Sequence, residues 1–419
     1  MLFQLFPTLD KHFSEPFTDL LKQWSVEFFS HLPQSTHEQM SRRLLDGLPP
    51  SAILSASPVL SKLSQVLARD RRLSPEIRQE LQKLETSEPR GHYPELRKQV
   101  GRLCSGRCRL GPALAEGSLA VVFPVTRDGR EGVAKVLKEG IAEQLHQELV
   151  ALEKSVRFFY LEVHKAGLPA FDYTSVIQRV RHYLLAELDL SQERRNMLSA
   201  RVHCNPDRLA IPRPWDISNE RVLVMERLFG APLHESSARR ALIELLIKPI
   251  FNSEELSVLH GDLHGGNLLS CEDGRIGVVD WGLCLHLTRG QRSQISRLTT
   301  ALMFGRASLA AQVLSELELE CSAFSLSGSL SEKLDSMLNA CSGELPEWMI
   351  ILRKTFHQLE GLVESMESKI SLEKVVLSEG IQQLALEMPF RWMVSPVTRN
   401  VFASNLSTAD LWSLALPLL

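Results

Sequence analysis

The sequence lacks an apolar run long enough to cross a membrane. Hydrophobic residues make up 44% of its 419 positions, but no segment reaches the ~18 consecutive apolar residues that a spanning helix needs. Asp10, Lys11 and Glu15 interrupt the first apolar residues, so the layout of a secretory signal is also missing. The apolar stretch 411–419 is expected to dock on the fold, with contact at a membrane surface as the alternative. These absences favour a cytoplasmic protein, with peripheral membrane contact left open.

An excess of charge of either sign is missing as well. The formal net charge at pH 7 is -3, which gives no electrostatic footprint for nucleic-acid binding. The seven cysteines show no paired metal-ligand spacing, and the closest two are Cys104 and Cys108. That usage predicts reduced thiols in an intracellular protein. The length suits two or three folding units with an ample core.

One segment contains a residue pattern that indicates a particular chemistry. Residues 260–267 read HGDLHGGN, and residues 276–282 read IGVVDWG. Asp262, an Asn five residues later and a second Asp thirteen residues after that have the spacing with which kinase folds hold Mg²⁺ and phosphates. Asp262 is the candidate proton acceptor, and Asn267 and Asp280 are candidate Mg²⁺ ligands with hard oxygen atoms. The alternative is a solvated Gly- and Asp-rich turn before a buried strand. It would explain the composition of this segment but not the order of its residues.

A candidate cation for the phosphates lies upstream. Residues 117–126 and 132–138 read as two strands joined by an Asp-Gly turn at 127–130. Lys135 stands between apolar neighbours on the second strand. Taken alone it would be a surface lysine, but the metal ligands downstream favour a phosphate-binding lysine.

The carboxylate partner of this lysine is expected on a helix. Residues 187–196 read ELDLSQERRN and continue with helix formers to about Val202. Glu193 and Asn196 are three residues apart and therefore share a helix face. A solvated acidic helix is the alternative.

These motifs, in this order, resemble the UbiB (AarF) family of atypical, protein-kinase-like proteins. The N-terminal signature of that family is Lys-x-Gly-Gln, followed by an Arg-Asp and a Pro. Here Lys62 and Gln65 match, Ser64 replaces the glycine, and Arg69-Asp70 and Pro75 follow. The similarity covers roughly residues 50–295.

The resemblance implies roles for individual residues and Mg²⁺ with ATP as cofactors. Lys135 would pair with Glu193, Asp262 would be the catalytic-loop acid, and Asn267 and Asp280 would bind the metal. Four residues would form a lid where protein kinases receive a peptide: Lys62, Gln65, Glu187 and Asp189. Such a lid favours ATPase activity, or transfer to a lipid or small-molecule acceptor, over protein phosphorylation.

The nucleotide loop departs from the family pattern. Family members usually carry an Ala-rich loop, Ala-Ala-Ser-x-x-Gln-Val, and here Glu116 and Gly117 stand where alanines are expected. Gly117, Ser118 and Ala120 are the candidate nucleotide contacts. Glu116 would bring a negative charge near the phosphates unless it turns outward, which leaves the preference for ATP or ADP open.

Residues 215–228 read as a β-hairpin that runs into a linker. By position this is the hinge whose backbone would bond adenine, at Met225 and Glu226. Met225 is a candidate gatekeeper, with an ordinary core position as the alternative.

The expected fold is α+β, a protein-kinase-like bilobal fold with a helical extension. We expect the extension at 1–105, a β-rich N-lobe at 106–228 and a helical C-lobe at 229–419. Predicted helices span 14–32, 59–71, 74–85, 141–165 and 237–257, and residues 87–94 read as a turn-rich segment.

Three functions compete. The first is an atypical kinase or ATPase of the UbiB type, with a role in lipid or isoprenoid-quinone metabolism that rests on the resemblance alone. The second is a small-molecule phosphotransferase of the aminoglycoside or choline kinase type, which the Asp280-Trp281-Gly282 form favours. The third is a nucleotide-binding scaffold without turnover.

Overall fold

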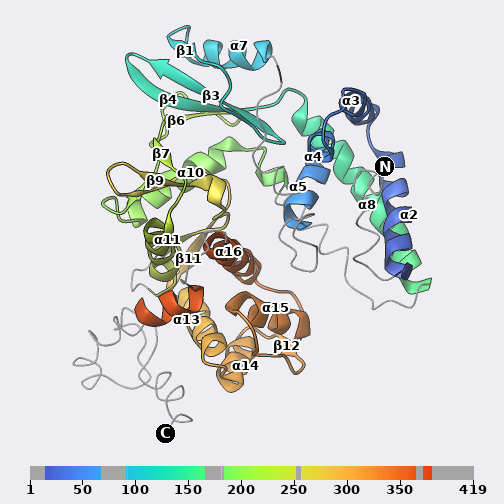
Figure 1. Cartoon of the computed structure of the whole chain (residues 1–419), viewed down its shortest axis with the longest axis vertical. Coiled ribbons are helices and arrows are strands. Elements are labelled where there is room, and N and C mark those ends of the chain that lie inside the picture. Colours follow the sequence, from blue (N-terminus) through green and yellow to red (C-terminus); the bar gives the residue numbers. More distant parts are fainter. Residues whose placement is uncertain are drawn as a thin grey trace. The chain divides into compact units, whose positions relative to one another are not determined.

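The structure, a computed structural model, describes residues 15–67, 91, 93–165, 181, 184–251, 256–364 and 371–379. It divides into two compact units (Figure 1). Unit 1 holds residues 1–194 and 214–227, and unit 2 holds residues 195–213 and 228–419. The predicted helix 74–85, the motif residues Arg69, Asp70 and Pro75, and the apolar stretch 411–419 lie outside the described residues.

Unit 1 contains an antiparallel sheet in the order β1-β3-β4-β6, and β2 also pairs with β3. The predicted hairpin is confirmed as β3 and β4, whose turn residues Asp128 and Gly129 both have positive φ, 50° and 74°. Two positive φ values in a two-residue loop match the twist of the flanking strands. The strands are β1 (Cys108–Leu110), β2 (Ala115–Glu116), β3 (Ala120–Arg127), β4 (Arg130–Leu137) and β6 (Val222–Glu226).

The sheet buries alternate side chains against a helix that the sequence did not predict. Val121, Phe123 and Val125 of β3 are buried together with Leu96 and Val100 of α7 (Pro94–Leu103). Figure 1 shows α7 beside β1 and β4. Pro94, the last residue of the predicted turn-rich segment, begins this helix, since proline is favoured in the first helical turn.

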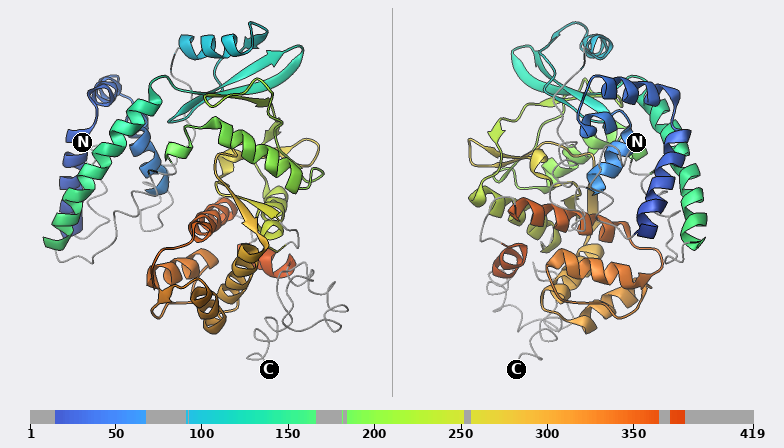
Figure 2. Two further views of the ribbon diagram at one scale, coloured as in Figure 1. Left: turned by 180° about the vertical axis from the view of Figure 1, so that it is seen from behind. Right: turned by 45° about the vertical axis from the view of Figure 1, so that its right-hand side comes forward.

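The N-terminal helices of unit 1 pack on α8, which has the predicted bounds Ile141–Lys165. Figure 2 shows α2 running alongside α8. The other helices here are α2 (Glu15–His31), α3 (Gln34–Leu45), α4 (Pro50–Leu54) and α5 (Pro58–Leu67). The sequence did not predict α3, because only Thr36 and Met40 of this helix are buried and the apolar periodicity is weak.

A buried carboxylate on α8 ties these helices together. Glu148 is fully buried and accepts hydrogen bonds from the hydroxyls of Thr36 (2.9 Å) and Ser57 (2.6 Å) and from the amide N–H of Val59 (3.2 Å). The side chain of Gln144 also donates to it, at 2.9 Å. Burial raises the pKa of Glu148, and these hydrogen bonds oppose the rise. The carboxylate fixes the start of α5, the helix that carries Lys62.

Replacing Glu148 by Ala should destabilise unit 1 strongly. The change leaves the Ser57 hydroxyl and the Val59 N–H buried without their acceptor, and we expect a loss of about 3 kcal/mol or more in the free energy of unfolding. Urea denaturation measures this loss. The control is Glu143→Ala, which removes an exposed carboxylate from the same helix and should cost less than about 0.5 kcal/mol. Equal losses in the two variants would contradict the anchoring role.

Unit 2 contains two small sheets. One has the order β5-β10-β9-β7, with β5 parallel to β10 and the other pairs antiparallel, and β8 pairs antiparallel with β11. The strands are β5 (Leu209–Ala210), β7 (Gly230–Ala231), β8 (Leu256–His260), β9 (Leu268–Cys271), β10 (Ile276–Val278) and β11 (Cys284–Thr288). A further short pair is β12 (Glu320–Cys321) with β13 (Cys341–Ser342).

Helices supply the rest of unit 2. α10 (Leu190–His203) begins in unit 1, and its part from Arg195 onward belongs to unit 2 and precedes β5. α11 (Glu235–Leu242) continues through a π-helical turn at Ile243–Ile247 into α12 (Lys248–Phe251). Beyond β11 come α13 (Arg289–Met303), α14 (Ala307–Glu316), α15 (Leu330–Ala340) and α16 (Glu347–Glu364). α16 contacts both α11 and α15. The mixed helix and sheet content agrees with the expected α+β class.

Two predicted elements differ in the structure. The helix expected at 237–257 ends at Phe251, because Leu256–His260 pairs with β11. Periodicity alone cannot tell a short buried strand from helix. The first arm of the hairpin expected from Trp215 is reduced to a single bridge between Pro214 and Met225, since proline has no N–H to offer a ladder.

The prediction of reduced thiols is wrong for four of the seven cysteines. Cys104 is disulfide-bonded to Cys108, and Cys321 to Cys341. The second pair is twenty residues apart in sequence and is brought together by the register of β12 with β13. Spacing in the sequence does not reveal such a pairing. Cys204, Cys271 and Cys284 are not disulfide-bonded.

Among the helices in the described ranges, none combines the length and the apolar content that crossing a bilayer requires.

Candidate functional site

The loop that follows β8 begins with a turn only glycine can make without displacing its neighbours. A Cβ at Gly261 would lie 2.8 Å from Leu283 and 3.0 Å from Ile351 of α16. The chain then passes Asp262 and enters a short 3-10 turn at Gly265–Asn267, before β9 begins at Leu268. A side chain at position 261 would push the loop away from both neighbours.

His260 joins the backbones of the two candidate aspartates. Its Nδ1 accepts the backbone N–H of Asp262 at 3.1 Å, and its Nε2 is hydrogen-bonded to the carbonyl oxygen of Asp280. The two partners require a neutral ring with its proton on Nε2. Burial lowers the pKa of His260, although the carbonyl of Asp280 and the nearby carboxylates oppose this. Trp281 packs edge-on against the imidazole, with 4.8 Å between the two ring centroids.

Asn267 and Asp280 lie at the same end of the hairpin formed by β9 and β10. Asn267 directly precedes β9, Asp280 follows β10, and Leu268 pairs with Val278 between them. The N–H of Val279 donates to the carbonyl oxygen of Asn267 at 3.1 Å. The side-chain amide of Asn267 donates to the carbonyl oxygen of Asp262 at 3.0 Å. The hairpin therefore brings the two predicted metal ligands and Asp262 together.

The donor chemistry of this end of the hairpin fits Mg²⁺. An amide oxygen and a carboxylate are hard ligands, and phosphate and water oxygens usually complete the shell of this ion. The described ranges contain no cluster of three or more His, Cys, Asp or Glu side chains arranged for a metal ion. Asn267 and Asp280 stay the predicted ligands, the residues that would hold the ion.

Asp262 has two side-chain partners that the sequence did not reveal. Lys354 Nζ lies 2.8 Å from Asp262 Oδ1, and the side-chain amide of Gln358 donates to the same oxygen at 2.5 Å. Both residues belong to α16. No motif marks them, and their i, i+4 spacing on an amphipathic helix was the only available signal.

The candidate phosphate-binding lysine is in unit 1. Lys135 on β4 pairs with Glu193 on α10, with 2.8 Å between Nζ and Oε2. The glutamate side chain is 3% exposed and the lysine side chain 19%, so the ion pair is largely shielded from solvent. The contact expected from the resemblance is present, and the role in binding phosphates stays a prediction.

The charge of Glu116, in the candidate nucleotide loop, is offset by a neighbouring lysine. Its carboxylate lies 2.8 Å from Lys138 Nζ and accepts the hydroxyl of Tyr93 at 2.6 Å. Burial lowers the pKa of Lys138, and the Glu116 carboxylate opposes that change. The charge at Glu116 is therefore balanced within unit 1.

The loop itself is a tight turn between β2 and β3. The N–H of Gly117 donates to the carbonyl oxygen of Ala120 at 2.8 Å. Ser118 is half-buried at the tip, and Ala120 begins β3, where it pairs with Leu137. The backbone of the turn thus lies beside the end of β4, the strand that carries Lys135.

Two of the four predicted lid residues are in contact with each other. Lys62 on α5 forms an ion pair with Glu187. Asp189 Oδ1 accepts the N–H of Ser191 at 2.8 Å, so this side chain caps α10. Gln65 is on α5 as well, and its side chain lies outside what the structure describes.

The hinge candidates lie on β6. Met225 is 5% exposed and pairs with Val133, and Glu226 is exposed and pairs with Gly132. Burial of Met225 agrees with a core position, and its part in nucleotide selection stays a prediction.

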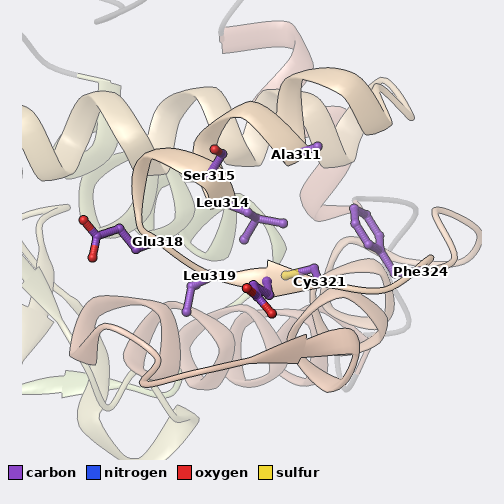
Figure 3. A pocket seen from close by; sticks show the side chains of 8 residues that line it. Ala311, Leu314, Ser315, Glu318, Leu319, Cys321 and Phe324 are labelled. Atoms are coloured by element: carbon purple, nitrogen blue, oxygen red, sulfur yellow. The ribbon is translucent and has the colours of Figure 1, made fainter.

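A cavity of about 420 Å³ lies elsewhere in unit 2, between α14 and β12 (Figure 3). Its walls are mostly apolar, with Leu314, Leu319 and Phe324 among the lining residues. None of the residues predicted from the sequence lines it.

Comparison with known proteins identifies the class. Residues 111–314 match the ABC1 atypical kinase-like domain. The probable protein kinase UbiB of Cellvibrio japonicus is 27% identical over 207 residues, which is 45% of this chain and 37% of that protein. An uncharacterized chloroplastic aarF domain-containing protein kinase of Arabidopsis thaliana is 30% identical over 190 residues, 41% of this chain and 34% of that protein.

One solved structure also resembles the chain. It is the complex of Rv3197 with erythromycin from Mycobacterium tuberculosis, with 19% identity, a TM-score of 0.44, and coverage of 73% of this chain and 90% of that one.

The chain thus has a kinase-like fold of the atypical kind. The domain match and the curated relatives support the UbiB/AarF family, as the resemblance predicted. The chain spans about two fifths of the length of the curated relatives it matches first.

His260 should make stability fall in mild acid. The pKa of His260 is lowered from its ordinary value near 6.5, so below that pH the unfolded chain binds a proton that the folded chain does not. The free energy of unfolding should therefore decrease as the pH falls from about 6.5 towards the lower folded pKa, by up to about 1.4 kcal/mol per pH unit. Urea denaturation at pH 7.5, 6.5 and 5.5 measures the slope.

His260→Asn should be less stable at pH 7.5 and should show a shallower slope. His146→Asn, at an exposed position on α8, should keep the slope of the unmodified chain. A slope that His260→Asn leaves unchanged would show that this ring does not control the acid sensitivity.

Proposed function

We propose that the chain binds Mg²⁺ and ATP and acts as a kinase or ATPase of the UbiB type. A lipid or small-molecule acceptor is favoured over a protein. The observation that carries the proposal is the hairpin end at which Asn267 and Asp280 lie beside the loop of Asp262. The match to the ABC1 atypical kinase-like domain supports the same class of chemistry.

Each residue has a distinct task in this proposal. Asp262 accepts the proton of the acceptor hydroxyl or of water. Asn267 and Asp280 hold the ion, which, when bound, offsets charge on the phosphate oxygens. Lys135, oriented by Glu193, binds the upstream phosphates.

The remaining predicted residues complete the nucleotide site in this proposal. Gly117, Ser118 and Ala120 contact the phosphates through the backbone, and the backbone of Met225 and Glu226 bonds adenine. Residues 106–228 then act as the N-lobe and 229–419 as the C-lobe, after an extension at 1–105. Glu116 does not oppose nucleotide binding, because Lys138 offsets its charge and Tyr93 donates a hydrogen bond to it.

The lid residues favour a non-protein acceptor. Lys62 is held by Glu187, and the family places this motif where protein kinases receive a peptide. Lys62, Gln65, Glu187 and Asp189 would exclude peptides in the same way here. A role in lipid or isoprenoid-quinone metabolism is the part of the proposal that rests on the family alone.

Trp281 favours a second candidate, a small-molecule phosphotransferase of the aminoglycoside or choline kinase type. Its indole is 1% exposed, and its N–H donates to the carbonyl oxygen of Val278 at 2.9 Å. The ion pair of Lys62 with Glu187 favours the first candidate. Phosphotransferases of the second type lack both the motif from Lys62 to Gln65 and the acidic segment 187–193.

Replacing Asp280 by Asn should abolish most turnover. The change removes the charged metal ligand, and we expect Mg²⁺-dependent phosphate release from ATP to fall by about 10²-fold or more. Purified protein is assayed with and without lipid vesicles. Asp273→Asn is the matched control, because it neutralises an exposed aspartate in the turn of the same hairpin.

Lys62→Ala distinguishes the candidates in the same assay. Altered turnover supports the UbiB-type lid, whereas unchanged turnover with a small hydroxyl acceptor supports the second candidate. Nucleotide binding without turnover under every lipid and acceptor condition would replace both with a binding scaffold.

Lys135→Met should weaken nucleotide binding. Loss of a charged hydrogen bond to phosphate costs about 1.5–3 kcal/mol, or about ten- to a hundredfold in Kd. Calorimetric titration with Mg-ATP measures the change. Lys98→Met removes an exposed lysine of α7 and should leave Kd unaltered. An unchanged Kd for Lys135→Met would remove this residue from the phosphate site.

A further inference from the structure

Glu116 lies on the face of the unit 1 sheet opposite to Lys135. On β2 it pairs with Val121 of β3, and Val121 pairs in turn with Val136 of β4. Lys135 pairs instead with Val122, the residue after Val121. Because side chains alternate along a strand and paired residues share a face, Glu116 and Lys135 project from opposite faces of the sheet. The carboxylate is therefore on the side away from the candidate phosphate-binding lysine.

The face that holds Glu116 is the one covered by α7. Val121 and Val136 are fully buried in the cluster that includes residues of this helix. Tyr93, which directly precedes α7, lies edge-on to Phe123 of β3, with 5.8 Å between the two ring centroids. The start of α7 thus reaches the strand that follows the candidate nucleotide loop.

Both oxygens of the Glu116 carboxylate have a partner on this face. Oε1 lies 2.8 Å from Lys138 Nζ, and Oε2 accepts the hydroxyl of Tyr93 at 2.6 Å. The side chains of Lys138 and Glu116 are 22% and 15% exposed, so solvent screens their attraction less than at an open surface. Together these side chains form the Glu116 cluster: Tyr93, Glu116 and Lys138.

The hydroxyl of Tyr93 is itself held in place. It accepts the backbone N–H of Gly91 at 2.9 Å. A Cβ at position 91 would lie 2.6 Å from the Tyr93 ring, so glycine allows the backbone to approach this closely. Since the hydroxyl oxygen already accepts a hydrogen bond, its single proton is available for Glu116.

The Glu116 cluster holds both ends of the candidate nucleotide loop. Glu116 directly precedes Gly117, whose N–H donates to the carbonyl oxygen of Ala120 at 2.8 Å. At the other end, the backbone N–H of Lys138 donates to the carbonyl oxygen of Leu119 at 2.9 Å. The ion pair between the side chains at 116 and 138 therefore ties the first residue before the loop to the strand end that binds its last residue.

We propose that Tyr93, Glu116 and Lys138 are positioning residues that fix the candidate nucleotide loop from the face turned away from Lys135. The family pattern has alanine at position 116, where neither contact could form. The carboxylate in this chain then supports the loop, and the loop backbone stays free to face the phosphates. The consequence for nucleotide affinity rests on the proposed function, whereas the consequence for the loop does not.

The first experiment measures amide hydrogen exchange of the full chain without nucleotide. In Glu116→Ala, the protection factors of the Gly117 and Lys138 amides should fall about fivefold or more, because the loop opens more often. Amides in the middle of β3 should keep their protection, which distinguishes opening of the loop from loss of the fold. Glu131→Ala, which removes an exposed carboxylate from β4, should change neither region. Unchanged exchange in the loop, or an equal acceleration throughout the sheet, overturns the inference.

Further variants test the ion pair itself by the same measurement. Lys138→Met should also loosen the loop, and the double variant should lose no more protection than Glu116→Ala alone, because both changes remove the same contact. Lys138→Arg keeps the charge and should retain most of the protection. Tyr93→Phe removes one hydrogen bond and should cause a smaller loss than Glu116→Ala. Additive losses in the double variant overturn the ion pair as the support of the loop.

The second experiment measures the consequence for the nucleotide by calorimetric titration with Mg-ATP. Glu116→Ala should raise Kd about fivefold, whereas Lys138→Arg should retain most of the affinity and Glu131→Ala all of it. If the unmodified chain binds ATP and a loosened loop leaves Kd unchanged, the positioning role is overturned although the proposed function stands. If the unmodified chain binds no ATP, the proposed function fails. The exchange pattern alone then decides whether the Glu116 cluster holds the loop.

Discussion

The arrangement of unit 2 depends on one neutral imidazole. His260 accepts the N–H of Asp262 and binds the carbonyl oxygen of Asp280, so a single ring sets the separation of two backbone segments. Protonation would replace the acceptor at Nδ1 with a donor facing the N–H of Asp262. The burial that keeps the ring neutral therefore also protects the geometry of both aspartates. Trp281 completes this enclosure by covering the imidazole.

Paired charges recur around the residues to which the sequence assigns chemistry. Lys135 faces Glu193, Lys62 faces Glu187, Lys138 faces Glu116, and Lys354 faces Asp262. Each lysine is less than one third exposed, and a partly buried cation without a carboxylate would pay a desolvation penalty. The paired carboxylates offset that penalty. The nucleotide of the proposed function would have to compete with these carboxylates for any lysine that it contacts.

The sequence predicted those parts of the fold that local patterns encode. The hairpin around Asp128 and Gly129 and the helix from Ile141 to Lys165 have turn or periodicity signals of their own. The order of Asp262, Asn267 and Asp280 predicted their hairpin. Lys354 could not be predicted, because its partner is 92 residues away and only the packing of α16 brings the two together. The disulfide of Cys321 with Cys341 depends on strand register in the same way.

The position of α16 in the chain also bears on how the protein is made. The bond of Gln358 to Asp262 spans 96 residues, so loop and support are synthesised at different times. During translation the HGDLHGGN segment leaves the ribosome well before its supporting helix, and contacts of such separation close late. A nascent chain that ends before Glu347 would contain the whole family motif in an unsupported loop. The contacts that α16 makes with Asp262 therefore form only after this helix has docked, although a shorter chain already contains every motif residue.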